Sequence, residues 1–343
     1  MDNSVFTGIF KRRSKLVKIH QKYNNFFHIN WFITNKCNYH CTYCHPFNHA
    51  GSSELYELDT YIEFVKKVLK QIGDTQLVIS FTGGEPTAMP IFDKFVDFLL
   101  ENNVKMGITS NGSKSIKWWR KYQKAFDWIS LSFHTETSNT RQFIDIVDTV
   151  WAHSLVSVRV MMHPEQKYFE KGLELYRLLK TRPFVTIVHV EKVPIVDDWL
   201  TDDEKYHEYT PEQQKHLNED LWFKRETSLP TKNKNEYKVP IDVTGVFRTA
   251  EGRYEEQSEL DTNAIAESRK NQFYGWDCYG GIEHLHVNDR GQIWGAACLQ
   301  GEQLGWIQDL KKFNLPKKPI LCQKHFCYCA TDMIISKEKR ENV

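Results

Sequence analysis

Between residues 28 and 190 the sequence repeats one unit, a short run of β-forming residues followed by an amphipathic segment. The predicted strands cover residues 28–34, 76–83, 105–112, 128–134, 157–163 and 184–190. Strands that alternate with helices pair in parallel through right-handed crossovers. Six such units predict an α/β fold, a partial (β/α)6 barrel of the TIM type with three-quarters of the usual eight units.

Amphipathic helices are predicted between these strands. From Leu58 to Ile72 apolar residues recur at the i, i+3, i+4 and i+7 spacing of a helix, and Gly73 ends the stripe. The same spacing recurs in three shorter stripes, which begin at Phe92, Phe143 and Leu175.

Side-chain alternation along the predicted strands indicates a polar interior. Ser130, Ser132 and His134 share one face of their strand, and Arg159 and His163 share one face of the next. Ser80 and Thr82 do the same in the second strand. A polar inner face is typical of an open interior that holds a polar ligand; the alternative is that these groups are solvated at strand ends.

Charge and hydropathy exclude some classes of protein. The net charge is +1, so no global field favours a nucleic acid or a membrane. No apolar run approaches the roughly 20 residues of a membrane span, and no signal peptide opens the chain, so we expect a cytoplasmic protein. The basic run over residues 11–22 is interpreted as a solvated face, the alternative being contact with an acidic partner.

The chain has eight cysteines, and they are clumped rather than scattered. Three lie within residues 37–44 and three within 322–329, with Cys278 and Cys298 between the groups. Thiols stay reduced in the cytoplasm, so clumped cysteines there indicate metal ligands rather than disulfides.

The first group forms a CxxxCxxC loop, Cys37, Cys41 and Cys44, directly after the first predicted strand. A tetrahedral zinc site needs four ligands, which this loop does not supply. A [4Fe–4S] cluster can take three cysteines and leave one iron open for a small molecule. Barrels of this kind bind ligands at the carboxyl ends of their strands, where this loop begins.

The loop resembles the CxxxCxΦC signature of the radical S-adenosylmethionine (SAM) superfamily, with Tyr43 at the aromatic position. Two further segments resemble motifs of the same superfamily. Gly83, Gly84, Glu85 and Pro86 are similar to its GGEP motif, and residues 109–112, Thr-Ser-Asn-Gly, to its TNG-like segment. The resemblance covers roughly residues 28–195.

The resemblance implies that the open iron binds SAM and that electron transfer cleaves it to a 5′-deoxyadenosyl radical. It also implies an external electron donor of the flavodoxin or ferredoxin kind. By analogy the GGEP segment contacts the methionine amino group and Tyr43 packs on adenine. The remaining cofactor-binding residues carried over are Ser110, Asn111, Ser132 and Arg159. For Ser132 and Arg159 an ordinary interior hydrogen bond or ion pair is the alternative.

Four segments are predicted: a 1–27 extension, the 28–195 barrel, a charged 196–270 insert and a 271–343 module. The insert is interpreted as a substrate lid or a linker, with a helix starting at Thr210-Pro211. In the module, residues 282–287 and 292–297 predict a β-hairpin. Its cysteines are Cys278, Cys298, Cys322, Cys327 and Cys329.

A hairpin flanked by cysteines resembles the twitch/SPASM extension of radical SAM enzymes, which holds auxiliary [4Fe–4S] clusters. Five cysteines suffice for one such cluster, and this number favours the shorter twitch form. The identity of the four cysteines that bind the cluster stays open. The alternatives are a zinc site and buried free thiols.

We therefore expect an enzyme that abstracts hydrogen from a small metabolite or a peptide, an oxidoreductase or a C–H functionalising maturase. Only about 27 residues precede the first strand, which argues against a leader-peptide-dependent maturase. His134, His163, His189 and Glu191 are candidate acids or bases, with solvated or satisfied side chains as the alternative. The alternative function is a non-catalytic iron–sulfur or zinc protein that binds or transfers electrons.

Overall fold

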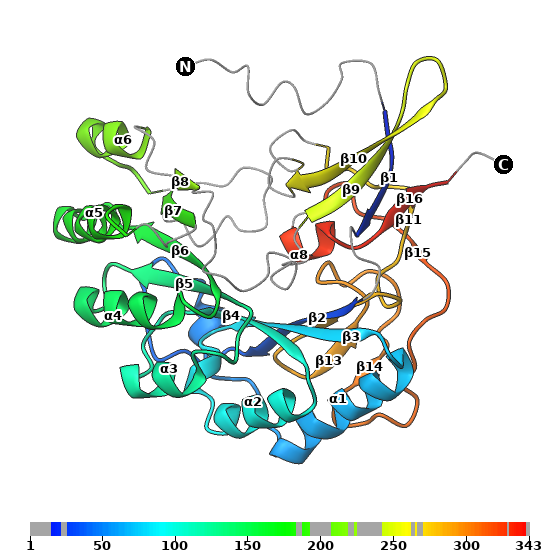
Figure 1. Cartoon of the computed structure of the whole chain (residues 1–343), viewed down its shortest axis with the longest axis horizontal. Helices are drawn as coiled ribbons and strands as arrows, with labels where there is room; N and C mark the ends of the chain where they lie inside the picture. The colour runs from blue at the N-terminus through cyan, green and yellow to red at the C-terminus, as the bar shows by residue number, and fades with distance from the viewer. Residues whose placement is uncertain are drawn as a thin grey trace.

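The computed structural model describes residues 15–21, 26–182, 187–192, 207–218, 223–224, 242–261, 265, 270–327 and 329–340. The described strands form two sheets (Figure 1). No described helix is long and apolar enough to cross a membrane.

The larger sheet contains the repeated units predicted from the sequence. Its central strands pair in parallel and in chain order. They are β2 (Phe26–Thr34), β3 (Gln76–Gly83), β4 (Lys105–Ser110), β5 (Trp128–His134), β6 (Leu155–Met162) and β7 (Ile187–Lys192). The bounds predicted for β3 and β5 are confirmed, and the others differ by a few residues. Residues 184–186 of the sixth predicted strand lie outside the described residues.

Helices follow these strands along the outer side of the sheet (Figure 1). They are α1 (Leu58–Ile72), α2 (Phe92–Glu101), α3 (Ile116–Tyr122), α4 (Thr140–Val150) and α5 (Gln166–Lys180). Most residues of the predicted stripes are buried or partly buried against the core, but Leu178 of the last stripe is exposed. Gly73 ends α1 with a φ of +60°, a conformation that favours glycine. The sequence analysis missed α3, a short helix whose buried face is aromatic.

One face of each central strand forms the main core, as alternation predicted. In β5, Ile129, Leu131 and Phe133 are fully buried, whereas Ser130 and Ser132 are half-buried. The apolar side chains pack with the helices in one continuous core, which leaves the polar ones on the opposite face. That opposite face therefore carries the serines that the sequence analysis placed inside.

The C-terminal part of the chain extends the same sheet. Strand β12 (His284–Val287) pairs in parallel with β2, with His284 opposite His28. It forms the predicted hairpin with β13 (Gln292–Trp294), and β14 (Gly305–Trp306) follows. At the other edge β8 (Phe223–Lys224) pairs with β7.

The second sheet joins both ends of the chain. Its order is β10 (Tyr254–Asp261), β9 (Asp242–Arg248), β1 (Lys15–Gln21), β16 (Lys337–Lys339), β11 (Trp276–Cys278) and β15 (Ile320–Leu321). The sequence analysis predicted neither β1 in the basic N-terminal run nor the β9–β10 hairpin in the charged insert. Most of that insert, and residues 11–14 and 22 of the basic run, lie outside the described residues.

Short helices complete the described structure. Helix α6 (Pro211–Asn218) starts at the predicted position, where Thr210 Oγ1 accepts a hydrogen bond from Gln213 N at 3.2 Å. The others are η1 (Pro46–His49), η2 (Pro86–Ala88) and α8 (Ala330–Met333).

Candidate functional site

The loop that carries Cys37, Cys41 and Cys44 follows directly on β2, at the carboxyl end of that strand. A backbone hydrogen bond of 3.1 Å from Cys44 N to Cys41 O folds it into a turn. Cys41 is buried, and Cys37 and Cys44 are half-buried. The three thiols therefore share one short loop at the sheet edge where parallel α/β sheets hold ligands.

The surroundings of these thiols fit thiolate ligands. Burial raises the pKa of all three, to about 12 for Cys41, so each holds its proton until a metal displaces it. Cys37 Sγ accepts hydrogen bonds from Tyr39 N at 3.4 Å and from Asn111 Nδ2 at 3.7 Å. Such bonds to a ligating sulfur stabilise its negative charge.

A site for a single metal ion would need several ligand side chains that converge on one point. Within the described ranges no three His, Cys, Asp or Glu side chains converge as they would around one metal ion. In an iron–sulfur cluster each cysteine binds its own iron, so the sulfurs are spread around the cluster. The donor chemistry of the loop fits a cluster better than zinc.

The segment after β3 lies against the backbone of the cysteine loop. Gly84 N donates to Thr34 O at 2.7 Å, and Glu85 N donates to Lys36 O at 2.8 Å. A Cβ at Gly83 would lie 2.2 Å from Thr34 O, and one at Gly84 would lie 2.3 Å from Lys36 O. The sequence analysis gave this segment a contact with the methionine amino group, which stays a prediction. In the structure the two glycines allow the two backbones to meet.

Glu85 connects this segment to the end of β4. Its fully buried carboxylate accepts hydrogen bonds from Thr87 N and Thr87 Oγ1, from Ser110 Oγ at 2.9 Å and from Asn111 N at 2.7 Å. Burial raises its pKa, and the hydrogen bonds oppose that shift. Pro86, also buried, begins η2. Glu85 and Ser110 are 25 residues apart in the sequence, and their hydrogen bond joins the Gly83–Pro86 segment to residues 109–112 beside Cys37.

Tyr43 is buried against the ends of β5 and β6. Its hydroxyl lies 2.7 Å from His134 Nδ1, and the two rings stack with centroids 6.0 Å apart. Burial lowers the pKa of His134 to about 4, so this imidazole is neutral and the tyrosine hydroxyl can donate to it. The packing of Tyr43 on adenine stays a prediction, and in the structure the ring contacts His134.

Glu136 anchors the same loop and was missed from the sequence. Its carboxylate accepts hydrogen bonds from Thr42 N at 3.0 Å and Thr42 Oγ1 at 2.9 Å. His163 Nε2 lies 3.8 Å from it, and burial lowers the pKa of that imidazole. Glu136 directly follows β5, so its position at a strand end was the available signal.

Four other predicted residues belong to the strands β5, β6 and β7. Ser132 and Arg159 are opposite each other in the β5–β6 register, Ser132 half-buried and Arg159 exposed. His189 and Glu191 belong to β7, whose side chains lie outside the description.

A buried polar chain crosses from the larger sheet to the C-terminal part. Ser80 Oγ lies 2.6 Å from His28 Nε2, and His28 Nδ1 lies 3.1 Å from His284 Nδ1. His284 Nε2 lies 4.0 Å from Asp332 Oδ1. Burial lowers the pKa of both histidines, to about 4 for His28. Alternation had placed Ser80 on the inner face, but nothing in the sequence paired His28 with a residue 256 positions away.

The C-terminal cysteines gather between the second sheet and α8. Cys278 ends β11, Cys298 lies beyond β13, Cys322 follows β15, and Cys327 and Cys329 precede α8.

Gln300, which the sequence analysis missed, links two of these thiols. Its Nε2 donates to Cys298 Sγ at 3.5 Å and to Cys322 Sγ at 3.4 Å. Cys329 Sγ instead lies 2.8 Å from Thr331 Oγ1. Burial raises the pKa of the thiols of Cys278, Cys298, Cys327 and Cys329, to about 11 for Cys298.

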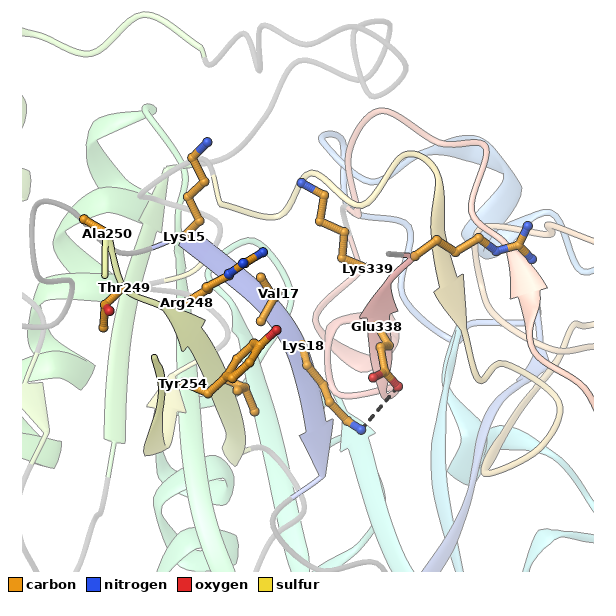
Figure 2. Close-up of a pocket in the computed structure, with 11 residues that line it drawn as sticks. Lys15, Val17, Lys18, Arg248, Thr249, Ala250, Tyr254, Glu338 and Lys339 are labelled. Carbon is orange, nitrogen blue, oxygen red and sulfur yellow. Dashed lines mark hydrogen bonds and ion pairs between the residues drawn. The ribbon is translucent and has the colours of Figure 1, made fainter. Parts of the chain in front are cut away.

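One hollow lies beside the cysteine loop, and another lies on the second sheet. The first, of about 200 Å³, lies between Asn38, Asn111 and Thr137. The second, of about 1000 Å³, is shown in Figure 2. Five of its eleven lining residues are basic, and most of the lining comes from β1, β9, β10 and β16, so the hollow is separate from the cysteine loop.

Comparison with known proteins supports the interpretation of the barrel region. The chain is 30% identical over 108 residues to a probable GTP 3′,8-cyclase of Pyrobaculum aerophilum, covering 31% of this chain and 34% of that protein. It is 33% identical over 88 residues to an S-adenosylmethionine-dependent nucleotide dehydratase of Selenomonas ruminantium, covering 25% and 30%. The chain thus spans about a third of the length of these curated relatives.

Among solved structures, "Native anSMEcpe with bound AdoMet" is 16% identical, with 82% of this chain and 78% of that chain covered. The TM-score is 0.48. The family model described as the Radical SAM superfamily matches residues 31–180, the segment that contains the cysteine loop and both motifs beside it. Over residues 31–180 the chain is therefore similar to the radical SAM superfamily.

Proposed function

We propose that this chain is a radical SAM enzyme, which reductively cleaves SAM to a 5′-deoxyadenosyl radical and abstracts hydrogen from an organic substrate. The observation that carries the proposal is the loop of Cys37, Cys41 and Cys44, fastened to the Gly83–Pro86 segment. A [4Fe–4S] cluster bound by these thiolates would supply an open iron for SAM and one electron for its cleavage.

The chain's own residues have defined tasks in this proposal. Glu85 ties the ends of β3 and β4 into one platform. Asn111 joins that platform to the loop, since its amide donates to Cys37 Sγ and to Asn38 Oδ1 at 3.0 Å. Glu136 holds the opposite side of the loop through Thr42. These contacts fix the loop before a cofactor binds, which lowers the cost of ordering it.

The parallel strands β2–β7 form the partial barrel of this proposal, with the half-buried serines of β5 on its inner face. Ser132 and Arg159, opposite each other across β5 and β6, remain candidates for contacts to SAM there. The relatives named above are described as acting on nucleotides, but they match this chain over parts of the SAM domain. A small metabolite, sugar-like or nucleotide-linked, and a peptide both remain within the proposed substrate class.

A second part of the proposal concerns the C-terminal cysteines. Four of the five would hold an auxiliary [4Fe–4S] cluster that assists oxidation or binds substrate. Their donors fit a cluster, because three of the residues are buried, none of the five has a disulfide partner, and Cys298 and Cys322 receive hydrogen bonds from Gln300. We favour Cys278, Cys298, Cys322 and Cys327, because Gln300 joins Cys298 to Cys322 whereas Cys329 pairs with Thr331.

The test is anaerobic reconstitution followed by iron analysis and electron paramagnetic resonance (EPR) of the reduced protein. We expect about eight irons per chain. SAM should change the spectrum of one cluster, and Cys41→Ala should remove that response and about four irons. A spectrum that SAM leaves unchanged in fully loaded protein would favour a binding or electron-transfer protein.

A further inference from the structure

Lys337 is a buried ammonium in β16. The residue is 2% exposed, and its Nζ donates hydrogen bonds to two backbone carbonyls, Asp332 O at 2.5 Å and Ile335 O at 2.9 Å. Among the described residues no carboxylate lies within 4.0 Å of it as an ion pair. A buried charge is costly unless an opposite charge lies nearby, so this position calls for an anion.

The surroundings of Lys337 include the ring of Phe273, whose centroid lies 5.1 Å from Nζ, and the C-terminal cysteines. Lys337 pairs directly with Cys278 across β11 and β16, so the two side chains share one face of the second sheet. Cys278 in turn packs with Ile335 and Cys298. Burial lowers the pKa of Lys337, but the charges of Cys327, Cys278 and Asp332 outweigh burial and raise it.

Asp332 alone does not account for the buried charge. Its carboxylate points elsewhere and accepts hydrogen bonds from Ala297 N at 2.8 Å and Cys298 N at 2.9 Å. Lys337 contacts only the backbone carbonyl of that residue. The carboxylate of Glu283 also lies within electrostatic range but accepts its hydrogen bonds from Ser336. Among the described residues neither carboxylate forms an ion pair with Lys337, whereas thiolates bound to metal would place negative charge beside it.

We propose that Lys337 is the built-in counter-charge of an anionic metal site formed by the C-terminal cysteines, and that it raises the reduction potential of that site. The proposal rests on the auxiliary cluster proposed above. Four thiolates give a [4Fe–4S] cluster a net negative charge, which reduction increases by one unit. A fixed cation beside the cluster stabilises the reduced state more than the oxidised state, because it interacts with the larger negative charge.

The experiment is an EPR-monitored redox titration of the reconstituted full chain. Lys337→Met removes the charge and keeps most of the aliphatic volume. Lys339→Met is the matched control, since Lys339 lies on the same strand but is exposed to water beside the basic hollow (Figure 2). A second variant, Lys337→Gln, keeps a hydrogen-bond donor for the carbonyls of Asp332 and Ile335. It tests the same loss of charge if Lys337→Met does not fold.

We expect both Lys337 variants to make reduction of the auxiliary cluster at least tenfold less favourable, a shift of about 59 mV to lower potential for one electron. The Lys339 variant and the SAM-binding cluster should keep the wild-type potential. Unchanged potential in a Lys337 variant that retains about eight irons would overturn the counter-charge but leave the auxiliary cluster standing. A wild-type protein with about four irons, all bound at the N-terminal loop, would overturn both.

Discussion

The contact between Gly84 and the cysteine loop makes the strongest prediction about the site. A methyl group at position 84 would lie 2.3 Å from Lys36 O, 2.6 Å from Lys36 C and 2.7 Å from Asn48 O. All three are backbone atoms, so the clash cannot be relieved by rotating a side chain. Gly84→Ala must therefore push the loop away from the end of β3.

The expected cost follows from two contributions. Overpacking of this kind costs about 1–3 kcal/mol. The hydrogen bonds from Gly84 N and Glu85 N to the loop, 2.7 and 2.8 Å long, contribute about 1 kcal/mol each if they are lost. With both hydrogen bonds lost, we expect Gly84→Ala to lower the free energy of unfolding by about 3–5 kcal/mol, measured by urea denaturation of the metal-free protein. After reconstitution it should also lose most iron from the N-terminal loop.

Gly107→Ala is the control for general destabilisation. Its Cβ would lie 1.8 Å from the Trp128 ring, so it also strains the sheet, but it does so away from the cysteine loop. This variant should lose stability and keep its iron. If Gly84→Ala were as stable as the wild type, or lost no more iron than Gly107→Ala, the reasoning about the loop would be refuted.

Three other predictions concern individual side chains. Burial raises the pKa of Glu85 in the folded protein above its value in the unfolded chain. Between these two pKa values the folded state binds more protons than the unfolded state, so the free energy of unfolding should fall as the pH rises through this range. Urea denaturation at a series of pH values should show this slope in the wild type but not in Glu85→Gln; equal slopes would contradict it. Tyr43→Phe leaves His134 Nδ1 without its 2.7 Å partner and should cost about 1–3 kcal/mol in thermal unfolding, an expectation that an unchanged midpoint would refute. Cys298→Ala should lose about four irons and destabilise the C-terminal part, while the protein still cleaves SAM. Cys329→Ala should keep those irons. If instead Cys329→Ala lost the irons and Cys298→Ala kept them, Cys329 would be the ligand in place of Cys298.

Much of the larger sheet could be predicted because its signals are local. The stripe from Leu58 to Ile72 determines α1 through the spacing of its own apolar residues, and Gly73 ends it. Alternation in β5 separates Ile129 from Ser130 in the same way. The three cysteines of the loop are likewise close in sequence, so their spacing alone indicated a shared ligand.

Contacts between distant segments left no such signal. Strand β1 looked like a solvated basic run, because the strands that pair with its two edges, β9 and β16, lie more than 220 residues away. The pairing of β12 with β2 brings His284 to His28, and neither residue predicts the other. Lys337 appeared in a charged C-terminal stretch, yet tertiary pairing with Cys278 buries it.

The glycines of the Gly83–Pro86 segment show a further limit. The sequence correctly indicated a close approach, since only glycine leaves room for it. It did not reveal which atoms approach. The structure identifies them as backbone oxygens of Thr34 and Lys36, so the motif shapes the cysteine loop before any ligand is present.

The measurement that tests the central claim most directly is mass spectrometry of SAM cleavage products. The reconstituted protein would be incubated without oxygen with dithionite and SAM, alone and with nucleotide, sugar and peptide candidates. We predict 5′-deoxyadenosine from the wild type and none from Cys41→Ala. Absence of 5′-deoxyadenosine under all these conditions, from protein whose N-terminal loop carries a full cluster, would contradict the assignment of SAM cleavage to this chain.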